Sequence, residues 1–158
     1  MISVPAIQKS DIRHHYNWAT PFYRLLWGAH IHHGLWDADE SSQIAQRRLV
    51  TTMIDRADIQ PGVRVLDVGC GMGGSSIHLA RELGCEVTGV TLSPVQRLWA
   101  TCEARWRGVA KRTTFICGDA ERIEFADNSF DVVWSIECTE HLFDKPAFFQ
   151  RAARLLRP

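Results

Sequence analysis

Apolar positions follow two different periods along this chain, and the change between them comes at the pair Pro61-Gly62. Over residues 42–57 apolar side chains recur at helical spacing, which predicts one helix with a single buried face. The aromatic segment before it, residues 11–27, predicts one or two short helices. Residues 30–40 are expected to form a loop. A mostly helical segment therefore precedes the Pro-Gly break.

After the break, short β-branched runs alternate with helical segments. The runs predict strands at residues 63–68, 85–90, 113–117 and 130–135. Helices are expected at residues 75–83, after the capping pair Ser93-Pro94, and after Asp144. Strands and helices that alternate at this spacing predict an α/β fold with a parallel sheet. A ligand would then bind at the carboxyl ends of the strands.

Apolar stripes on two of these helices predict which side chains are buried. The helix after Ser93 is expected to bury Val95, Leu98, Trp99 and Cys102. The last helix is expected to bury Phe148, Phe149, Ala152, Leu155 and Leu156. The aromatic residues between Tyr16 and Trp36 are interpreted as core, with the wall of an apolar pocket as the alternative.

A glycine-rich turn joins the first predicted strand to its helix. Residues 69–74 fit the pattern G-x-G-x-x-G, which is typical of nucleotide-like cofactor sites, NAD sites included. Asp67 stands two residues before the first glycine, where its carboxylate would repel a pyrophosphate but suits a cationic ligand. An NAD site also needs an acid at the end of the second strand, where this chain has Thr91 and Leu92. Both features argue against NAD.

Composition excludes several other classes of protein. In 158 residues, 18 Lys and Arg balance 18 Asp and Glu, so the chain lacks the positive field of a nucleic-acid binder. No apolar run approaches the roughly 20 residues of a membrane span. Five cysteines without a C-x-x-C pair favour a reducing cytoplasm over a disulfide framework or a zinc ribbon. His30, His32 and His33 lack further ligands at suitable spacing, so no metal site is expected.

Five motifs, in order along the chain, resemble those of class I S-adenosylmethionine-dependent methyltransferases. They are WGAHIHHGLW (27–36), VLDVGCGMGG (65–74), VTGVTLSPVQ (87–96), CGDAE (117–121) and FDVVWSIECTEHL (130–142). The first motif is similar to the lid segment of the tocopherol type. The third resembles the second-strand segment of the branch that contains tocopherol methyltransferases, cyclopropane fatty acid synthases and alkaloid N-methyltransferases. The resemblance implies a Rossmann-like sheet and S-adenosyl-L-methionine as cofactor. It also implies methyl transfer to O, N or C of a small apolar or aromatic, for example prenylated, molecule.

The resemblance also implies a set of cofactor-binding residues. Asp67 and the glycines would hold the methionine part and the ribose, and Asp119 would bind the adenine amino group. Cys70 is expected to be a small buried side chain of the loop rather than a nucleophile. The full set is Asp67, Gly69, Cys70, Gly71, Gly74, Thr91, Leu92, Gln96, Asp119, Ala120 and Ile136.

Glu140 and His141 are the catalytic candidates, with Glu137 as a second carboxylate nearby. Methyl transfer from a sulfonium is an in-line displacement, so alignment supplies most of the rate and proton removal supplies the rest. In the similar alkaloid N-methyltransferases a Glu-His pair acts as this base. The Asn/Asp-Pro-Pro-Tyr signature of nucleic-acid amino-methyltransferases is absent after the fourth predicted strand. The bicarbonate variant of the cyclopropane synthases is less expected here.

The predicted domains are an N-terminal helical cap or lid at residues 1–60 and a cofactor-binding domain at 61–158. The second holds only the first four strands of the Rossmann-like sheet and is expected to be incomplete at its C-terminus. An alternative is therefore a truncated cofactor-binding half-domain without full catalytic competence. The uncovered edge of the fourth strand predicts self-association.

Overall fold

The computed structural model describes residues 7–158, so the first six residues of the predicted cap lie outside the described part. Its helices and strands are α1 (Lys9–Leu26), α2 (Ser42–Arg56), β1 (Arg64–Val68), α3 (Gly74–Glu82), β2 (Glu86–Thr91), α4 (Pro94–Trp106), β3 (Thr113–Cys117), β4 (Val132–Trp134), a 3-10 turn η1 (Thr139–His141) and α5 (Lys145–Leu155). Within residues 7–158, no helix is long and apolar enough to cross a bilayer.

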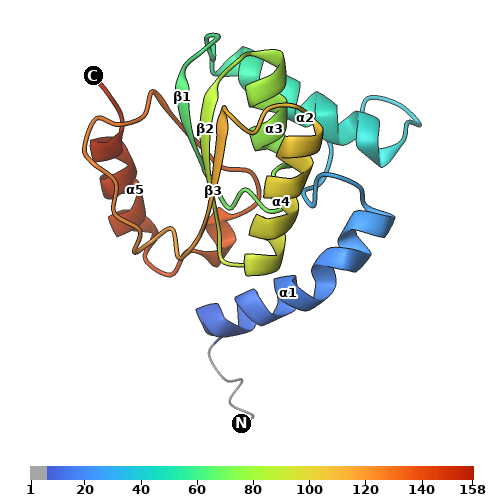
Figure 1. Cartoon of the computed structure of the whole chain (residues 1–158), viewed down its shortest axis with the longest axis horizontal. Coiled ribbons are helices and arrows are strands. Elements are labelled where there is room, and N and C mark those ends of the chain that lie inside the picture. The colour runs from blue at the N-terminus through green and yellow to red at the C-terminus, as the bar shows by residue number, and fades with distance from the viewer. Residues whose placement is uncertain (1–6) are drawn as a thin grey trace.

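The four strands form one parallel sheet in the order β3-β2-β1-β4, as the alternation of strands and helices predicts. Helices α2, α3 and α4 lie on one side of this sheet and α5 lies on the other (Figure 1). Alternate residues of β1 divide between the two sides, since Val65 belongs to the core under α2–α4 and Leu66 to the core under α5. The layers are those of a Rossmann-like α/β fold.

The N-terminal segment forms one helix rather than one or two short ones. α1 begins at Lys9, before the predicted start, and continues through Pro21 to Leu26. Ile12, Ala19 and Thr20 are its buried residues, and in Figure 1 the helix lies next to α4. Packing of this face explains why the helix tolerates an internal proline, because tertiary contacts supply most of a helix's stability.

The apolar stripe predicted for α4 is wrong. Its buried residues are Gln96, Ala100 and Ala104, while Leu98 is 59% exposed. Leu98 lies on the opposite side of the helix from Gln96 and Ala100, so the face toward the sheet carries smaller side chains. In α5 the prediction is confirmed for Phe148, Ala152 and Leu155, which are buried; Leu156 is half-buried and Phe149 is exposed.

The interpretation of the N-terminal aromatic residues as core is also wrong. The tryptophan and phenylalanine side chains of this group are exposed: Trp18, Phe22, Trp27 and Trp36. Within residues 7–158, these four side chains therefore do not belong to a core. Tyr16 differs from them, because it lines the cavity described below.

β4 is shorter than its predicted range. Phe130 does not pair with β1 but forms a parallel bridge with Leu156, near the end of the described chain. Asp131 then connects the start of β1 to the segment after α5, because its carboxylate accepts hydrogen bonds from the Arg64 amide (2.7 Å) and from the Arg157 guanidinium (2.9 Å). Only Val132–Trp134 continue the ladder beside β1.

Gly73 offers a test of how closely α3 approaches its neighbours. Its φ is +83°, and an added Cβ would lie 2.9 Å from the Ala100 Cβ and 3.1 Å from the Phe115 ring. Gly108 has a similar φ of +77° but open space around it. Alanine at either position costs about 1–2 kcal/mol of backbone strain. We expect Gly73→Ala to lose about 1–3 kcal/mol more than Gly108→Ala in urea unfolding, from overpacking. Equal losses would show that the contact is not tight.

Candidate active site

A cavity opens at the carboxyl ends of the strands, under α1 and the lid (residues 27–36). It has an empty volume of about 1040 Å³, counting the part open to solvent. Every residue predicted to bind the cofactor lines it: Asp67, Gly69, Cys70, Gly71, Gly74, Thr91, Leu92, Gln96, Asp119, Ala120 and Ile136. The three catalytic candidates line it too: Glu137, Glu140 and His141. Residues from four separate motifs therefore meet in one place.

The glycine loop is tightly enclosed. Gly69 has a φ of +75°, and a Cβ there would collide with the Cys138 side chain. A Cβ on Gly74 would lie 2.6 Å from His30 Nδ1 and 2.7 Å from the Ala29 carbonyl oxygen. The loop thus touches the segment after β4 on one side and the lid on the other, and only glycine leaves room for both.

Asp67 carries a buried carboxylate at the end of β1. Its side chain is 2% exposed and accepts a 2.5 Å hydrogen bond from the Ser76 hydroxyl. Burial raises the pKa of Asp67 to about 6, although the Ser76 hydrogen bonds oppose this. Within residues 7–158 no Lys, Arg or His side chain forms an ion pair with it. A positively charged ligand group would supply the missing partner.

The end of β2 and the start of α4 form a buried polar network. Thr91 donates a 2.7 Å hydrogen bond to Gln96 Oε1, and the Ser93 hydroxyl caps α4 by accepting from the Gln96 amide. Ser93 also donates to Asn17 Oδ1 on α1 at 2.7 Å. Gln96 is therefore held in one orientation at the cavity wall, and α1 is connected to that wall.

Asp119, in the loop after β3, is partly engaged. Its Oδ1 accepts from the Glu121 amide at 3.0 Å and lies 3.3 Å from Lys9 Nζ. Its Oδ2 has only the loose contact with Arg122 at 3.9 Å. One carboxylate oxygen thus remains open to an amino group in the cavity.

Lys9, which the sequence did not single out, joins this loop to the catalytic segment. Its ammonium contacts Glu121 and donates to the His141 carbonyl oxygen at 2.9 Å. Partial burial raises the pKa of Glu121, but Lys9 and the amides of Asp144 and Phe143 outweigh it and bring that pKa to about 2. The start of α1 is therefore anchored by charge.

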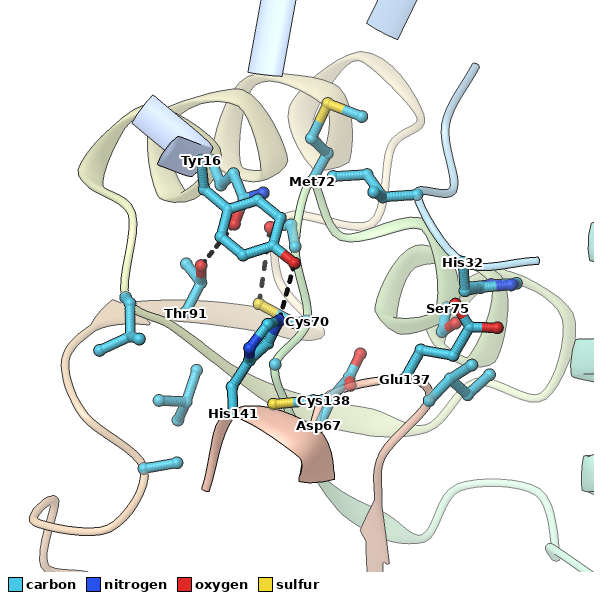
Figure 2. Close-up of a pocket in the computed structure, with 18 of the residues that line it drawn as sticks. Tyr16, His32, Asp67, Cys70, Met72, Ser75, Thr91, Glu137, Cys138 and His141 are labelled. Atoms are coloured by element: carbon cyan, nitrogen blue, oxygen red, sulfur yellow. Dashed lines mark hydrogen bonds between the residues drawn. The ribbon is translucent and has the colours of Figure 1, made fainter. Parts of the chain in front are cut away.

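His141 points toward α1 rather than toward its neighbour in sequence. Its Nε2 lies 3.0 Å from the Tyr16 hydroxyl, as Figure 2 shows. Burial, together with Tyr23 and nearby acidic groups, raises the pKa of Tyr16 to about 12, so this hydroxyl stays protonated at neutral pH. Within the described residues no hydrogen bond joins Glu140 to His141, and Glu140 is exposed. The Glu140-His141 pair stays a prediction, while the Tyr16-His141 pair is a feature of the structure.

Glu137 connects the catalytic segment to the lid. Its carboxylate accepts from the His33 amide at 3.0 Å and contacts His33 Nδ1 at 2.9 Å, which raises the pKa of the exposed His33. Glu137 has a φ of +48°, a backbone strain that often marks functional segments. Within residues 7–158, no group of three or more His, Cys, Asp or Glu side chains is placed to hold a metal ion.

Trp134, another residue absent from the prediction, ends β4 at the cavity. It is 3% exposed, and its buried indole N–H has no hydrogen-bond partner. Tyr16 and Lys9 escaped prediction because their partners lie more than 100 positions away in sequence. The helical spacing of Ile12, Tyr16 and Thr20 was the one available signal for this face of α1.

Comparison with known proteins agrees with the fold and the motifs. A family model described as "Methyltransferase domain" matches residues 66–158. Tocopherol O-methyltransferase of Arabidopsis thaliana, a chloroplastic protein, is 37% identical over 169 residues, which cover 99% of this chain and 48% of that relative. The chain thus spans about half the length of the relatives it matches.

Two solved structures show the same arrangement of elements. The crystal structure of the 4+2 cyclase SpnF has a TM-score of 0.91 and 34% identity, and the match covers 99% of this chain and 59% of that one. Coclaurine N-methyltransferase bound to N-methylheliamine and S-adenosylhomocysteine has a TM-score of 0.75 and 26% identity, covering 80% and 38%. Because the family model matches more than half of the chain, glycine loop and catalytic segment included, the chain belongs to the methyltransferase domain family.

Proposed function

We propose that this chain binds S-adenosyl-L-methionine in the cavity and acts in methyl transfer to a small molecule. The observation that carries the proposal is the Asp67 carboxylate, which is buried near the end of β1 and forms no ion pair with any Lys, Arg or His side chain of residues 7–158. S-adenosyl-L-methionine offers an ammonium group for such a carboxylate, and it supplies an electrophilic methyl group on a sulfonium. Its lack of phosphates suits a cavity whose glycine loop lies beside an acid.

Other residues of the cavity fit the remaining parts of this cofactor. Asp119 keeps one carboxylate oxygen open, which suits the adenine amino group. Thr91 and Gln96, held together by their hydrogen bond, are assigned to the ribose side as the family resemblance implies. The unpaired indole N–H of Trp134 is a further donor for an acceptor atom of the ligand. The donors and acceptors of the cavity therefore complement a cationic nucleoside.

His141 is placed to take the proton that an O–H or N–H acceptor loses as it is methylated. Its ring lines the cavity, and the Tyr16 hydroxyl at Nε2 holds the ring in place. Because Tyr16 keeps its own proton at neutral pH, it acts as a positioning residue rather than as the base. Glu140 is proposed to assist His141, and Glu137 is the second carboxylate proposed for the catalytic segment.

The acceptor is proposed to be small and apolar or aromatic. The walls of the cavity include the apolar side chains of Ile12, Ile136 and Leu142. Two similar proteins are named tocopherol O-methyltransferase and coclaurine N-methyltransferase. The balanced net charge supports a small molecule over a nucleic acid. Five free cysteines support a reducing compartment such as the cytoplasm.

A cofactor-binding domain without turnover is the alternative. β4 pairs with β1 on one side and ends the sheet on the other, within the described residues. An open parallel edge of this kind favours self-association along β4. The name of SpnF, a cyclase, also shows that this fold is found in proteins named for a different reaction. Turnover must therefore be measured separately from binding.

Calorimetric titration with S-adenosylhomocysteine and with NAD tests the cofactor. We expect S-adenosylhomocysteine to bind, and to stabilise the folded chain by about 2.7 kcal/mol at one hundred times its Kd. NAD is expected to produce neither heat nor stabilisation, because Asp67 repels its pyrophosphate. Binding of NAD in place of S-adenosylhomocysteine would overturn the assignment.

Asp67→Asn tests two consequences of the buried carboxylate, cofactor binding and the pH dependence of stability. We expect it to weaken S-adenosylhomocysteine binding at least about 30-fold, because a buried charge partner is lost. The folded pKa of about 6 exceeds the ordinary 3.8, so the native state keeps a proton that the unfolded state releases. The wild type therefore loses stability as pH rises from about 4 to 6, by up to about 3 kcal/mol, and the variant does not.

Urea unfolding of the free protein at pH 4 and pH 7 measures this effect. The exposed Asp127 provides the matched control, since Asp127→Asn should leave both the binding and the pH dependence of the wild type unchanged. If Asp67→Asn binds S-adenosylhomocysteine as the wild type does, the carboxylate does not recognise the cofactor.

His141→Ala tests the proposed base. We expect the variant to keep its affinity for S-adenosylhomocysteine and to lose about 100- to 10,000-fold in turnover. Tyr16→Phe should lose about five- to tenfold, the value of one neutral hydrogen bond. S-adenosylhomocysteine release with a panel of prenylated phenols and secondary amines is the assay, and exposed His14→Ala is the control. Unchanged turnover in His141→Ala would exclude this base.

A further inference from the structure

A second cavity, here called the outer cavity, lies between the ends of α1, α2, α3 and α4 on the far side of the lid. Its empty volume is about 1350 Å³, counting the part open to solvent. The two cavities are lined by different residues except at a shared wall, which consists of Ala29, His30, Met72 and Gly74. None of the residues assigned to catalysis lines the outer cavity.

Arginines from four helical segments converge on the outer cavity: Arg24, Arg47, Arg81 and Arg107. Two of them have acidic partners, because Arg107 pairs with Glu103 at 2.9 Å and Arg81 with Glu82 at 3.4 Å. Across residues 7–158, the ion pairs include neither Arg24 nor Arg47. The cavity therefore carries two guanidinium groups that its own carboxylates leave unneutralised.

His78 also lines the outer cavity, and charged side chains nearby change its pKa. Burial lowers the pKa of His78, and Glu82 opposes that change. Arg47 and Arg81 then lower the same pKa further. The lining of the outer cavity holds four arginines against the two acids Glu82 and Glu103, so positive side chains are in excess there.

Gln46, which lines the outer cavity, has an unpaired hydrogen-bond acceptor. This side chain is 1% exposed, and its Nε2 donates to the carbonyl oxygens of His30 at 3.2 Å and His32 at 3.1 Å. Those two acceptors determine the orientation of the amide, so the remaining atom is Oε1. Gln46 Oε1 is buried and has no hydrogen-bond partner. A buried acceptor of this kind calls for an O–H or N–H donor.

We propose that the outer cavity is a binding site for a small organic oxyanion that also carries a hydrogen-bond donor. Its phosphate or carboxylate group would pair with Arg24 and Arg47, whose planar guanidinium groups suit such anions. Its hydroxyl or amino group would donate to Gln46 Oε1. Met72, Ile77 and Trp99 supply apolar wall for the body of the ligand between these ends.

A ligand in the outer cavity would affect binding in the active site, because the two cavities share a wall. His30 and Ala29 of the lid press directly on Gly74 of the glycine loop, and Gln46 holds the lid by two of its carbonyl groups. A ligand that immobilises Gln46 stabilises the closed lid, and the two sites then raise each other's affinity. This coupling rests on the proposed function, whereas binding in the outer cavity does not.

Calorimetry with 4-hydroxyphenyl phosphate and with 4-hydroxybenzoate on the full chain tests the site, and the two probes distinguish phosphate from carboxylate ligands. We expect at least one of them to bind. Arg24→Gln and Arg47→Gln should each weaken that binding about tenfold or more. Arg56→Gln is the control. Arg56 lies on α2 and is exposed, as Arg47 is, but it does not line the outer cavity. Removing the ligand hydroxyl, as in phenyl phosphate or benzoate, should weaken binding about fivefold without altering the buried Gln46.

Saturating S-adenosylhomocysteine distinguishes the two cavities. The probe should still bind in its presence, with equal or higher affinity. Displacement of the probe would place it in the active site and overturn the proposal, as would an equal loss of affinity in Arg56→Gln. If neither probe bound to the wild type, that result would also overturn the proposal. Urea unfolding of each arginine variant confirms that a lost signal is not a lost fold.

Discussion

The buried carboxylate of Asp67 is the constraint on which the site depends. It ends an inner strand of the sheet, and the chain turns sharply around it through glycines that leave no space for a Cβ. Burial raises its pKa to about 6, so the free protein carries a desolvated acid that destabilises the fold near neutral pH. A cationic ligand would remove that cost on binding, which links the stability of the fold to recognition of the proposed cofactor.

Polar contacts with the N-terminal segment complete the cavity. Lys9 meets Glu121, Tyr16 meets His141, Asn17 meets Ser93, and His33 meets Glu137. Several of these pairs are partly exposed, and exposed ion pairs contribute little stability each. Of these residues, His33 belongs to the lid (residues 27–36). The other side of the lid forms part of the outer cavity, so one segment separates two chemically different sites.

Local patterns sufficed for the parts of the fold that depend on neighbours in sequence. Alternating periodicity predicted the parallel sheet. The Ser93 cap of α4 was predicted too, and the glycine loop and the acid before it line the cavity. The predictions failed where packing between elements decides. α4 turns Ala100 and Ala104 toward the sheet instead of Leu98, and the N-terminal tryptophans are exposed because nothing within residues 7–158 buries them.

The sequence by itself determined the order of the elements, the turn around Asp67 and the candidate residues of the cavity, since strand ends and helix starts follow from local backbone preferences. Only the tertiary structure decided which groups meet. The partner of His141 is Tyr16 rather than Glu140, Lys9 anchors α1 to the loop after β3, and four arginines from separate segments surround one outer cavity. These contacts join residues far apart in the chain, and their geometry exists only once α1 and the lid have packed on the sheet.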